Sequence, residues 1–294
     1  MAATLTAPSP ARTDRRGHTP NDTEQARFAE VQRLTYEGAE AVAALLIPGM
    51  SERDAAHTFK DWLVDHGADD WFHLPFAWFG DRTAFRHFKF PLQFFPSGRT
   101  LEEGMPYILD AAPVVRGATA DIGFAGCLGE NPALDRVMDD LAAHRALIVE
   151  MVRDRHTFRE VYEAVDKLAF EQGYANRHHA YPGHVIAHEV LPLAETPGIG
   201  TMFGFGRRHL RSLARSVVNG RRQRWSPLWS GDRRSDHAPV NGLWAVEPHL
   251  GLRGIGAKFE EYLVVTDGDV FWLDDDLPHT RRWTARGITE FGAR

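Results

Sequence analysis

Apolar residues recur at helical spacing from residue 26 to residue 46, which predicts a long amphipathic helix at the start of the folded chain. Asn21 and Glu24 stand where the N-cap and the third residue of this helix belong, and the pattern ends before Pro48. A second helix is predicted over residues 51–67. The chain therefore opens with two consecutive helices.

The second half of the chain repeats this order in outline. Helical periodicity returns over residues 132–151 and 157–173. Each pair of helices is followed by strand-like sequence, at 107–124 and at 242–273, and Asp267-Gly268 predicts a hairpin turn in the second of these stretches. The pattern predicts an α/β (α+β) chain.

The segment 107–124 reads as a hairpin that carries two acids in apolar sequence. Its strands are 107–115 and 118–124, with Arg116-Gly117 as the turn. If the turn is centred between Val115 and Arg116, Asp110 lies directly opposite Asp121. Like charges in that position repel unless a cation lies between them, and carboxylate oxygens suit a divalent metal. The alternative is that one or both acids lie in a turn or on an edge strand, in water.

Further acids and a histidine occur in similar surroundings later in the chain. A lone charge would be costly to bury in these apolar or Gly/Pro-rich contexts. The candidate metal ligands are Asp110, Asp121, His184, Glu247 and Glu260. Five ligands exceed what one structural zinc needs, and they suit a two-metal site in which bridging carboxylates hold the ions close.

A zinc-binding helix is a second interpretation of His184 and His188, which are four residues apart. Pro182 and Pro192 on either side disfavour a helix there, and Glu189 follows the second histidine rather than the first. The neighbouring residues His178 and His179 are expected at the surface, where His179 could line the mouth of a pocket. Glu261, beside a candidate ligand but on the opposite strand face, is expected in solvent.

Composition narrows the class of protein. The chain has 294 residues, 43% hydrophobic and 25% charged, with a formal net charge of −6, as expected for a globular protein that is not a dedicated nucleic-acid or membrane binder. It has no apolar run long enough to span a bilayer. The single cysteine, Cys127, excludes an internal disulfide and fits a cytoplasmic location. Residues 1–20 are expected to form a disordered tail, followed by one catalytic domain over 21–294.

A basic insert interrupts this domain at about residues 204–236. Between Arg207 and Arg234 there are nine arginines and one acid, so the local formal charge is +8. Helical periodicity predicts a helix that ends at Asn219-Gly220. One hypothesis is that this helix and the 225–229 loop overhang the metal site and select anionic substrates through Arg208, Arg211 and Arg215. The alternative is a solvated or subunit-contacting helix, which leaves a homodimer open.

Several short motifs together resemble a known family, the pita-bread metallopeptidases, which include methionine aminopeptidase, aminopeptidase P, prolidase and creatinase. The resemblance covers about residues 24–294. It rests on motifs that occur in the family's order: Pro48-Gly-Met-Ser-Glu52, the spacing from Asp110 to Asp121, Gly183-His184 with His188-Glu189, Val246-Glu247-Pro248, and Phe259-Glu260 with Leu263-Val-Val-Thr-Asp-Gly268. It implies a curved, mostly antiparallel sheet with helices on its outer face and a pseudo-two-fold repeat.

The resemblance also implies roles for the candidate ligands. Two divalent ions (Mn, Co, Fe or Zn) would be bound, with Asp110 as a terminal ligand of one and with Asp121 and Glu260 bridging both. His184 and Glu247 would complete the second ion, and Glu247 would also act as general base.

Three further residues would face the substrate according to the same resemblance. His188 would contact the scissile carbonyl or its oxyanion, and His87 would be the substrate-side histidine. Lys258 stands where prolidase-like sequences have an arginine, so recognition there is expected to differ. The short interval between His184 and His188 is a second departure and requires a deletion.

The resemblance implies a hydrolase that cleaves a peptide or amide bond near the amino end of a small substrate, as an aminopeptidase or Xaa-Pro dipeptidase does. The motif sequences are most similar to those of the branch that cleaves Xaa-Pro bonds, prolidase and aminopeptidase P, although the N-terminal domain typical of that branch is not seen. A creatinase-like or other small-molecule tailoring enzyme is the alternative enzyme. A non-catalytic pita-bread binding module is the alternative from another class, but such relatives typically lose metal ligands.

Overall fold

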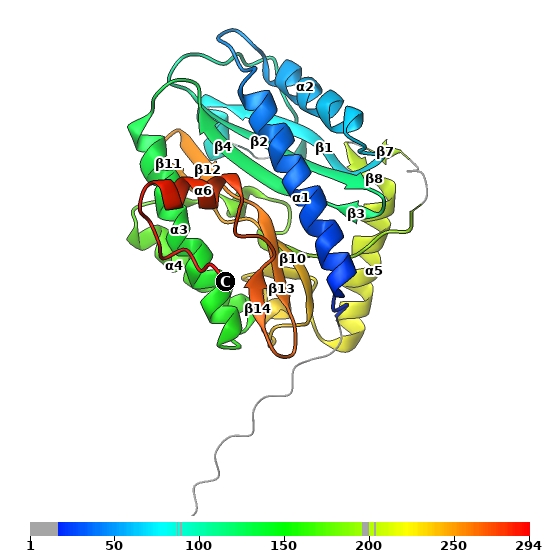
Figure 1. Cartoon of the computed structure of the whole chain (residues 1–294). Helices are drawn as coiled ribbons and strands as arrows, with labels where there is room; N and C mark the ends of the chain where they lie inside the picture. Colours follow the sequence, from blue (N-terminus) through cyan, green and yellow to red (C-terminus); the bar gives the residue numbers. More distant parts are fainter. Residues whose placement is uncertain (1–16, 87, 89, 196–199, 203) are drawn as a thin grey trace, which may run out of the picture.

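The computed structural model describes residues 17–294 except 87, 89, 196–199 and 203, and it shows a mixed α/β fold (Figure 1). The helices are α1 (Asp22–Ala43), α2 (Glu52–Asp65), α3 (Pro132–Arg153), α4 (Phe158–Glu171), α5 (Arg207–Gln223) and α6 (Pro278–Ala285). Residues 1–16 of the expected N-terminal tail lie outside the described part of the chain.

The strands form three sheets whose pairs are antiparallel. The first contains β1 (Asp70–Phe79), β2 (Pro106–Val115), β3 (Ala118–Thr119), β4 (Ile122–Cys127), β7 (Thr201–Met202) and β8 (Phe205–Gly206). The second contains β6 (Val185–Val190), β9 (Leu228–Ser230), β10 (Gly242–Val246), β13 (Glu261–Val265) and β14 (Val270–Trp272). The third contains β5 (Ala175–Asn176), β11 (His249–Leu252) and β12 (Ile255–Lys258).

The helices cover the outside of these sheets, as Figure 1 shows. Helices α1 and α2 contact β2 and β1 of the first sheet, whereas α3 contacts β11 and β12 of the third and β14 of the second. This arrangement confirms the expected α/β fold, with two helices before each main set of strands.

The helix starts predicted from capping patterns are confirmed. Asn21 and Glu24 form a reciprocal capping box at the start of α1, and Ser51 and Asp54 do the same for α2. These signals are reliable because each satisfies backbone N–H groups that the first helical turn leaves unpaired.

The register of the 107–124 hairpin differs from the prediction. Val115 pairs with Ala118, which confirms Arg116-Gly117 as the two-residue turn, and both of its residues are left-handed, with φ of 48° and 78°. Asp110 therefore faces Gly123 rather than Asp121. The turn centre lies one residue later than assumed, which shifts every pair by two positions but keeps Asp110 and Asp121 on one face.

The basic helix α5 is longer than predicted. It continues through Gly220 to Gln223, because Gly220 serves close packing rather than termination: a Cβ there would lie 2.6 Å from the carbonyl oxygen of Trp225. Its inward positions are also less apolar than expected, since Ser216 is buried while Val218 is 47% exposed.

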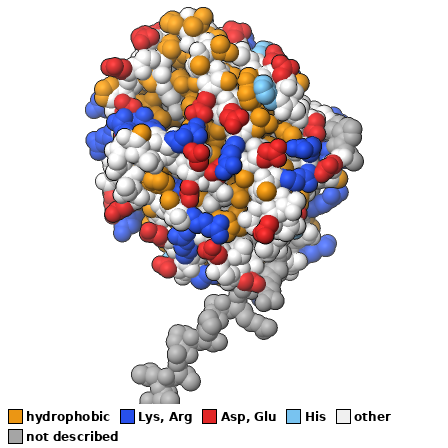
Figure 2. Space-filling view, viewed as in Figure 1, with side chains coloured by type: hydrophobic (Ala, Val, Ile, Leu, Met, Phe, Trp, Pro, Cys, Tyr) orange, Lys and Arg blue, Asp and Glu red, His pale blue; other side chains and the backbone are white. Residues whose placement is uncertain are grey.

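Surface charge is mixed on the face drawn in Figure 2, where acidic and basic side chains alternate. Among the described helices, none combines the length and the apolar character that a bilayer crossing requires.

Candidate active site

Four buried carboxylates lie within or directly beside strands of all three sheets. Asp110 lies within β2, Asp121 directly before β4, Glu247 directly after β10 and Glu260 between β12 and β13. Their exposed fractions are 8% or less. The acids that the sequence singled out are therefore brought into one cluster, where each needs a compensating cation or donor.

His73 joins this cluster although no role was predicted for it. From β1, its Nε2 lies 3.3 Å from Oδ1 of Asp110 and 3.2 Å from Oδ1 of Asp121. Its Nδ1 lies 2.9 Å from the carbonyl oxygen of Leu74 and so carries a proton. Burial alone would lower the pKa of His73, but its hydrogen bond to Asp121 and the charges of both acids raise it to about 9.

His188 contacts the cluster from the other side. Its Nε2 lies 3.1 Å from Oδ2 of Asp121, and its Nδ1 faces the carbonyl oxygen of Glu189 at 3.3 Å. Donor atoms of Asp121, His188 and Glu260 all lie within 4.8 Å of one another. His188 thus occupies the ligand-like position that was expected for His184.

The structure does not bring His184 into the cluster. It is exposed, has a φ of 53°, and its backbone N–H donates to the carbonyl of Tyr181 in a tight turn just before β6. Its ring centroid lies 6.2 Å from that of His179, away from the acids. The short interval before His188 leaves room only for this turn, so β6 carries His188 rather than His184 to the acids.

Lys258 lies among three of the acids at the end of β12. Its Nζ donates to Asp110 at 2.6 Å, to Glu247 at 2.8 Å and to Glu260 at 2.9 Å. Burial alone would lower the pKa of Lys258, but these three charges raise it well above its usual value. The sequence predicted Lys258 as a substrate contact, whereas its ammonium group is engaged by the carboxylates.

The carboxylates respond differently to burial. For Asp121, burial would raise the pKa, but hydrogen bonds from His188 and His73 hold it well below its usual value. For Glu247 and Glu260, burial and the neighbouring acids raise the pKa in spite of Lys258. The site therefore combines an acid that stays ionised with acids suited to accept a proton.

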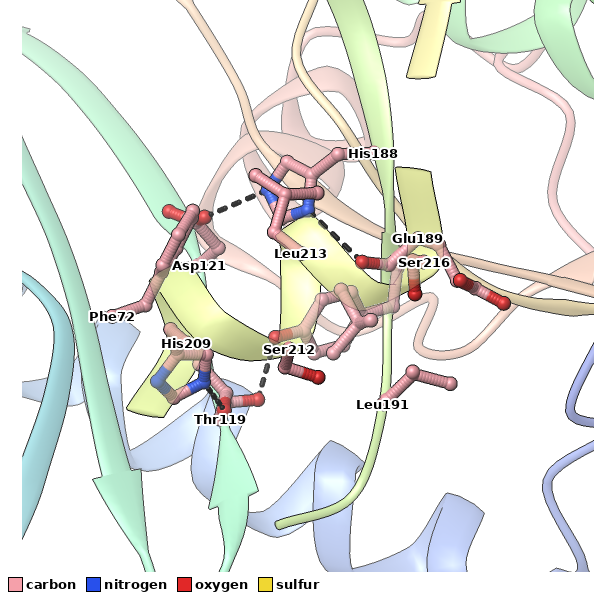
Figure 3. A pocket seen from close by; sticks show the side chains of 12 residues that line it. Phe72, Thr119, Asp121, His188, Glu189, Leu191, His209, Ser212, Leu213 and Ser216 are labelled. Carbon is pink, nitrogen blue, oxygen red and sulfur yellow. Dashed lines mark hydrogen bonds and ion pairs between the residues drawn. The ribbon is translucent and has the colours of Figure 1, made fainter. Parts of the chain in front are cut away.

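Helix α5 covers one side of the cluster (Figure 3). His188 points toward Asp121, and Ser212 and Leu213 of α5 line the same cavity of about 30 Å³, room for one or two waters. His209, also from α5, contacts Thr119 Oγ1 at 2.7 Å, and burial lowers its pKa to about 4.

The predicted arginine contacts lie elsewhere on α5. Arg208 pairs with the buried Asp70 at 3.4 Å and donates to the carbonyl of Ala194, while Arg211 and Arg215 are exposed.

The remaining predicted residues either lie away from the cluster or are not among the residues that the structure describes. His87 is not among the described residues. His179 is exposed and contacts Asp166 at 2.9 Å, whereas His178, expected at the surface, is fully buried. Glu261, expected in solvent, is also fully buried, because Arg145 holds both of its oxygens at 2.6 and 3.0 Å.

The donor set fits a divalent metal ion. Asp121, His188 and Glu260 offer two carboxylates and an imidazole, and His73 adds a second imidazole beside Asp110 and Asp121. Both histidines direct Nε2 toward the acids while Nδ1 faces a backbone carbonyl, an orientation typical of metal-binding histidines.

Comparison with known structures identifies the fold. The chain is similar to the X-Pro aminopeptidase from Thermotoga maritima, with 17% identity over 89% of this chain and 63% of that one, at a TM-score of 0.65. A dipeptidase from Pyrococcus horikoshii matches with 19% identity over 87% and 61%, at 0.63. The methionine aminopeptidase from Rickettsia prowazekii matches with 12% identity over 87% and 98%, at 0.59.

This chain spans less than two thirds of the length of the first two relatives, and nearly all of the third. No curated protein sequence matches it. The model of metallopeptidase family M24 matches residues 26–267, which is most of the chain. The fold, the match to the family and the buried carboxylate–histidine cluster agree, and this chain belongs to metallopeptidase family M24.

Proposed function

We propose that this chain hydrolyses a peptide or amide bond near the amino end of a small substrate, at the cluster around Asp121. The observation that carries the proposal is the convergence of four buried carboxylates and two imidazoles in one cluster. Membership of a metallopeptidase family supports the reaction class. The neighbours include enzymes named as an X-Pro aminopeptidase and a dipeptidase, which supports a short peptide as substrate.

Asp121, His188 and Glu260 would hold a divalent ion. When bound, such an ion supplies Lewis acidity, which lowers the pKa of water and polarises a carbonyl group. Asp110 and His73 border the same position and would keep Asp121 oriented.

Glu247 would take the proton from the attacking water. It lies directly after β10 beside Lys258, and burial raises the pKa of its carboxyl group, which makes the carboxylate a better proton acceptor. Lys258 fixes one of its oxygens, which holds the base in a defined position.

His73 would donate to the developing oxyanion, the role that the sequence had suggested for His188. Its Nε2 lies beside Asp110 and Asp121, and its Nδ1 is fixed by the carbonyl of Leu74, which holds the ring in one orientation. A charged donor held in a buried site stabilises a transition state more than it does in water.

Hydrolysis assays on purified protein test this proposal. We expect cleavage of at least one member of a panel of Xaa-Pro dipeptides, Met-peptides and small amides. Activity should be lost on chelation and restored by Mn²⁺, Co²⁺, Fe²⁺ or Zn²⁺. Glu247→Gln keeps the shape of the base and should lower kcat by about 10²-fold or more. Glu163→Gln, on the exposed face of α4, is the matched control. No cleavage of any panel member with any of these metals would contradict the proposal.

A further inference from the structure

Lys258 is a buried cation in the middle of the predicted metal ligands. Its side chain is 1% exposed, and its three carboxylate partners are 3–11% exposed. An ammonium group has three hydrogens to donate, and Asp110, Glu247 and Glu260 lie in position to accept all three. The hydroxyl of Tyr181 lies 3.2 Å from the same nitrogen.

The backbone is shaped to let this lysine reach the acids. A Cβ on Gly123 would lie 2.1 Å from Cε of Lys258 and 2.9 Å from its Cδ and Cγ. Gly123 pairs with Asp110 across β2 and β4, so the lysine stem crosses β4 at a residue without a side chain. The absence of a side chain at Gly123 is therefore matched to the position of Lys258.

The acids that hold Lys258 are three of the predicted ligands of a pair of metal ions: Asp110 of one ion, Glu247 of the other, and Glu260 of both. A divalent ion binds carboxylate oxygens at about 2.0–2.2 Å, so an ion bound by Asp110, Glu247 and Glu260 would compete with the ammonium for the same space. Two cations at such a distance also repel strongly in a buried site. An ion at that position therefore requires Lys258 to leave.

One metal position remains beside Lys258. Asp121 and His188 do not contact the ammonium, and together with Glu260 they place three donor atoms within 4.8 Å. The other possible group in this cluster is His73 with Asp110 and Asp121. Both of its acids are already engaged, Asp110 by Lys258 and Asp121 by the first position, whereas the first position shares only Glu260 with Lys258.

We propose that Lys258 takes the place of one of the two divalent ions, so that the chain binds a single ion at Asp121, His188 and Glu260. The inference rests on the proposed function only in assuming that the cluster binds metal. The ammonium then supplies a permanent positive charge that neutralises Asp110 and positions Glu247.

Manganese binding to the wild-type protein tests the inference without any substitution. Metal-free protein is titrated with Mn²⁺, bound metal is counted by equilibrium dialysis, and the electron paramagnetic resonance spectrum of the bound ion is recorded. About one ion per chain with the spectrum of isolated Mn²⁺ is expected. Two ions per chain with a spin-coupled spectrum, or no bound ion, would overturn the inference. A protein that binds one ion but cleaves no peptide would contradict the proposed function alone.

Lys258→Met removes the charge while keeping an unbranched side chain. The freed carboxylates should then bind a second ion, raising the count from about one to about two per chain. Lys167→Met, at an exposed position of α4, is the control and should stay at about one. A folded Lys258→Met protein that still binds one ion would overturn the inference, and if that variant does not fold, the wild-type count decides.

Discussion

At the scale of single residues, the sequence predicted the acids of the site better than its other members. Asp110, Asp121, Glu247 and Glu260 stand out because an acid in an apolar strand needs a partner wherever it is buried. No role was predicted for His73, because a histidine among aromatic residues can pack against its sequence neighbours and does not by itself require a charged partner. Its contact with Asp121 depends on β1 pairing with β2, which no local pattern specifies.

His73 should make the stability of the metal-free protein depend on pH. Its folded pKa of about 9 lies above the ordinary value of 6.5, so its stabilising contribution is complete below pH 6.5 and is lost as pH rises through 9. The free energy of unfolding of chelator-treated protein should fall over this window, by up to about 3 kcal/mol from His73. His73→Gln should flatten the fall in urea-unfolding measurements; identical pH profiles for the two proteins would contradict the assignment.

At the scale of elements, local signals predicted where helices and hairpins occur but not their full register. Capping boxes at Asn21 and Ser51 and the Asp267-Gly268 hairpin are confirmed because each is decided by a few adjacent residues. The 107–124 hairpin and its Arg116-Gly117 turn were predicted correctly, whereas the pairing register was wrong by two positions because the turn centre was assumed one residue too early. Similarly, Gly220 could not be distinguished from a helix stop without its contact to Trp225.

The Arg116-Gly117 turn should be sensitive to a side chain at Gly117. Its φ is 78°, and a Cβ there would lie 2.3 Å from the carbonyl oxygen of Leu193. Gly117→Ala should therefore lower the free energy of unfolding by about 1–3 kcal/mol, as measured by urea denaturation. Gly268→Ala, in the other hairpin, meets no atom within 4 Å and should cost clearly less. Equal losses would argue against this turn geometry.

The arginines of α5 should divide into one structural residue and several solvated ones. Arg208→Gln leaves the buried Asp70 without its charged partner and should destabilise the protein by about 1–3 kcal/mol. Arg211→Gln, on the exposed side, should change neither stability nor KM for anionic substrates. A clear rise in KM for anionic substrates in Arg211→Gln would instead favour the selection of anions that the charge pattern suggested.

At the scale of the whole molecule, the family and the pita-bread fold predicted from motif order are confirmed. The main wrong predictions of burial concern residues whose partners are distant in the sequence. Glu261 was expected in solvent because it points to the strand face opposite that of the neighbouring candidate ligand, Glu260. Its partner Arg145 comes from α3, more than a hundred residues earlier, and the same arginine also contacts Asp275 and the carbonyl of Phe291.

Arg145 should therefore be important for holding α3, β13 and the C-terminal segment together. Arg145→Met removes a fully buried partner of Glu261 and should lower the free energy of unfolding by about 3–5 kcal/mol. Arg159→Met, whose pair with Glu163 on α4 is largely exposed, should cost less than about 1 kcal/mol. Chemical denaturation of both variants gives the comparison, and similar losses would contradict a special role for the buried pair.

Anomalous diffraction from crystals loaded with Co²⁺ tests the central claim most directly, because it locates the metal whether or not a substrate is known. The account predicts a peak within about 2.0–2.3 Å of ligand atoms from Asp121, His188 and Glu260, with His184 still turned to solvent. A peak bound by His184, or no peak among the buried carboxylates, would contradict it.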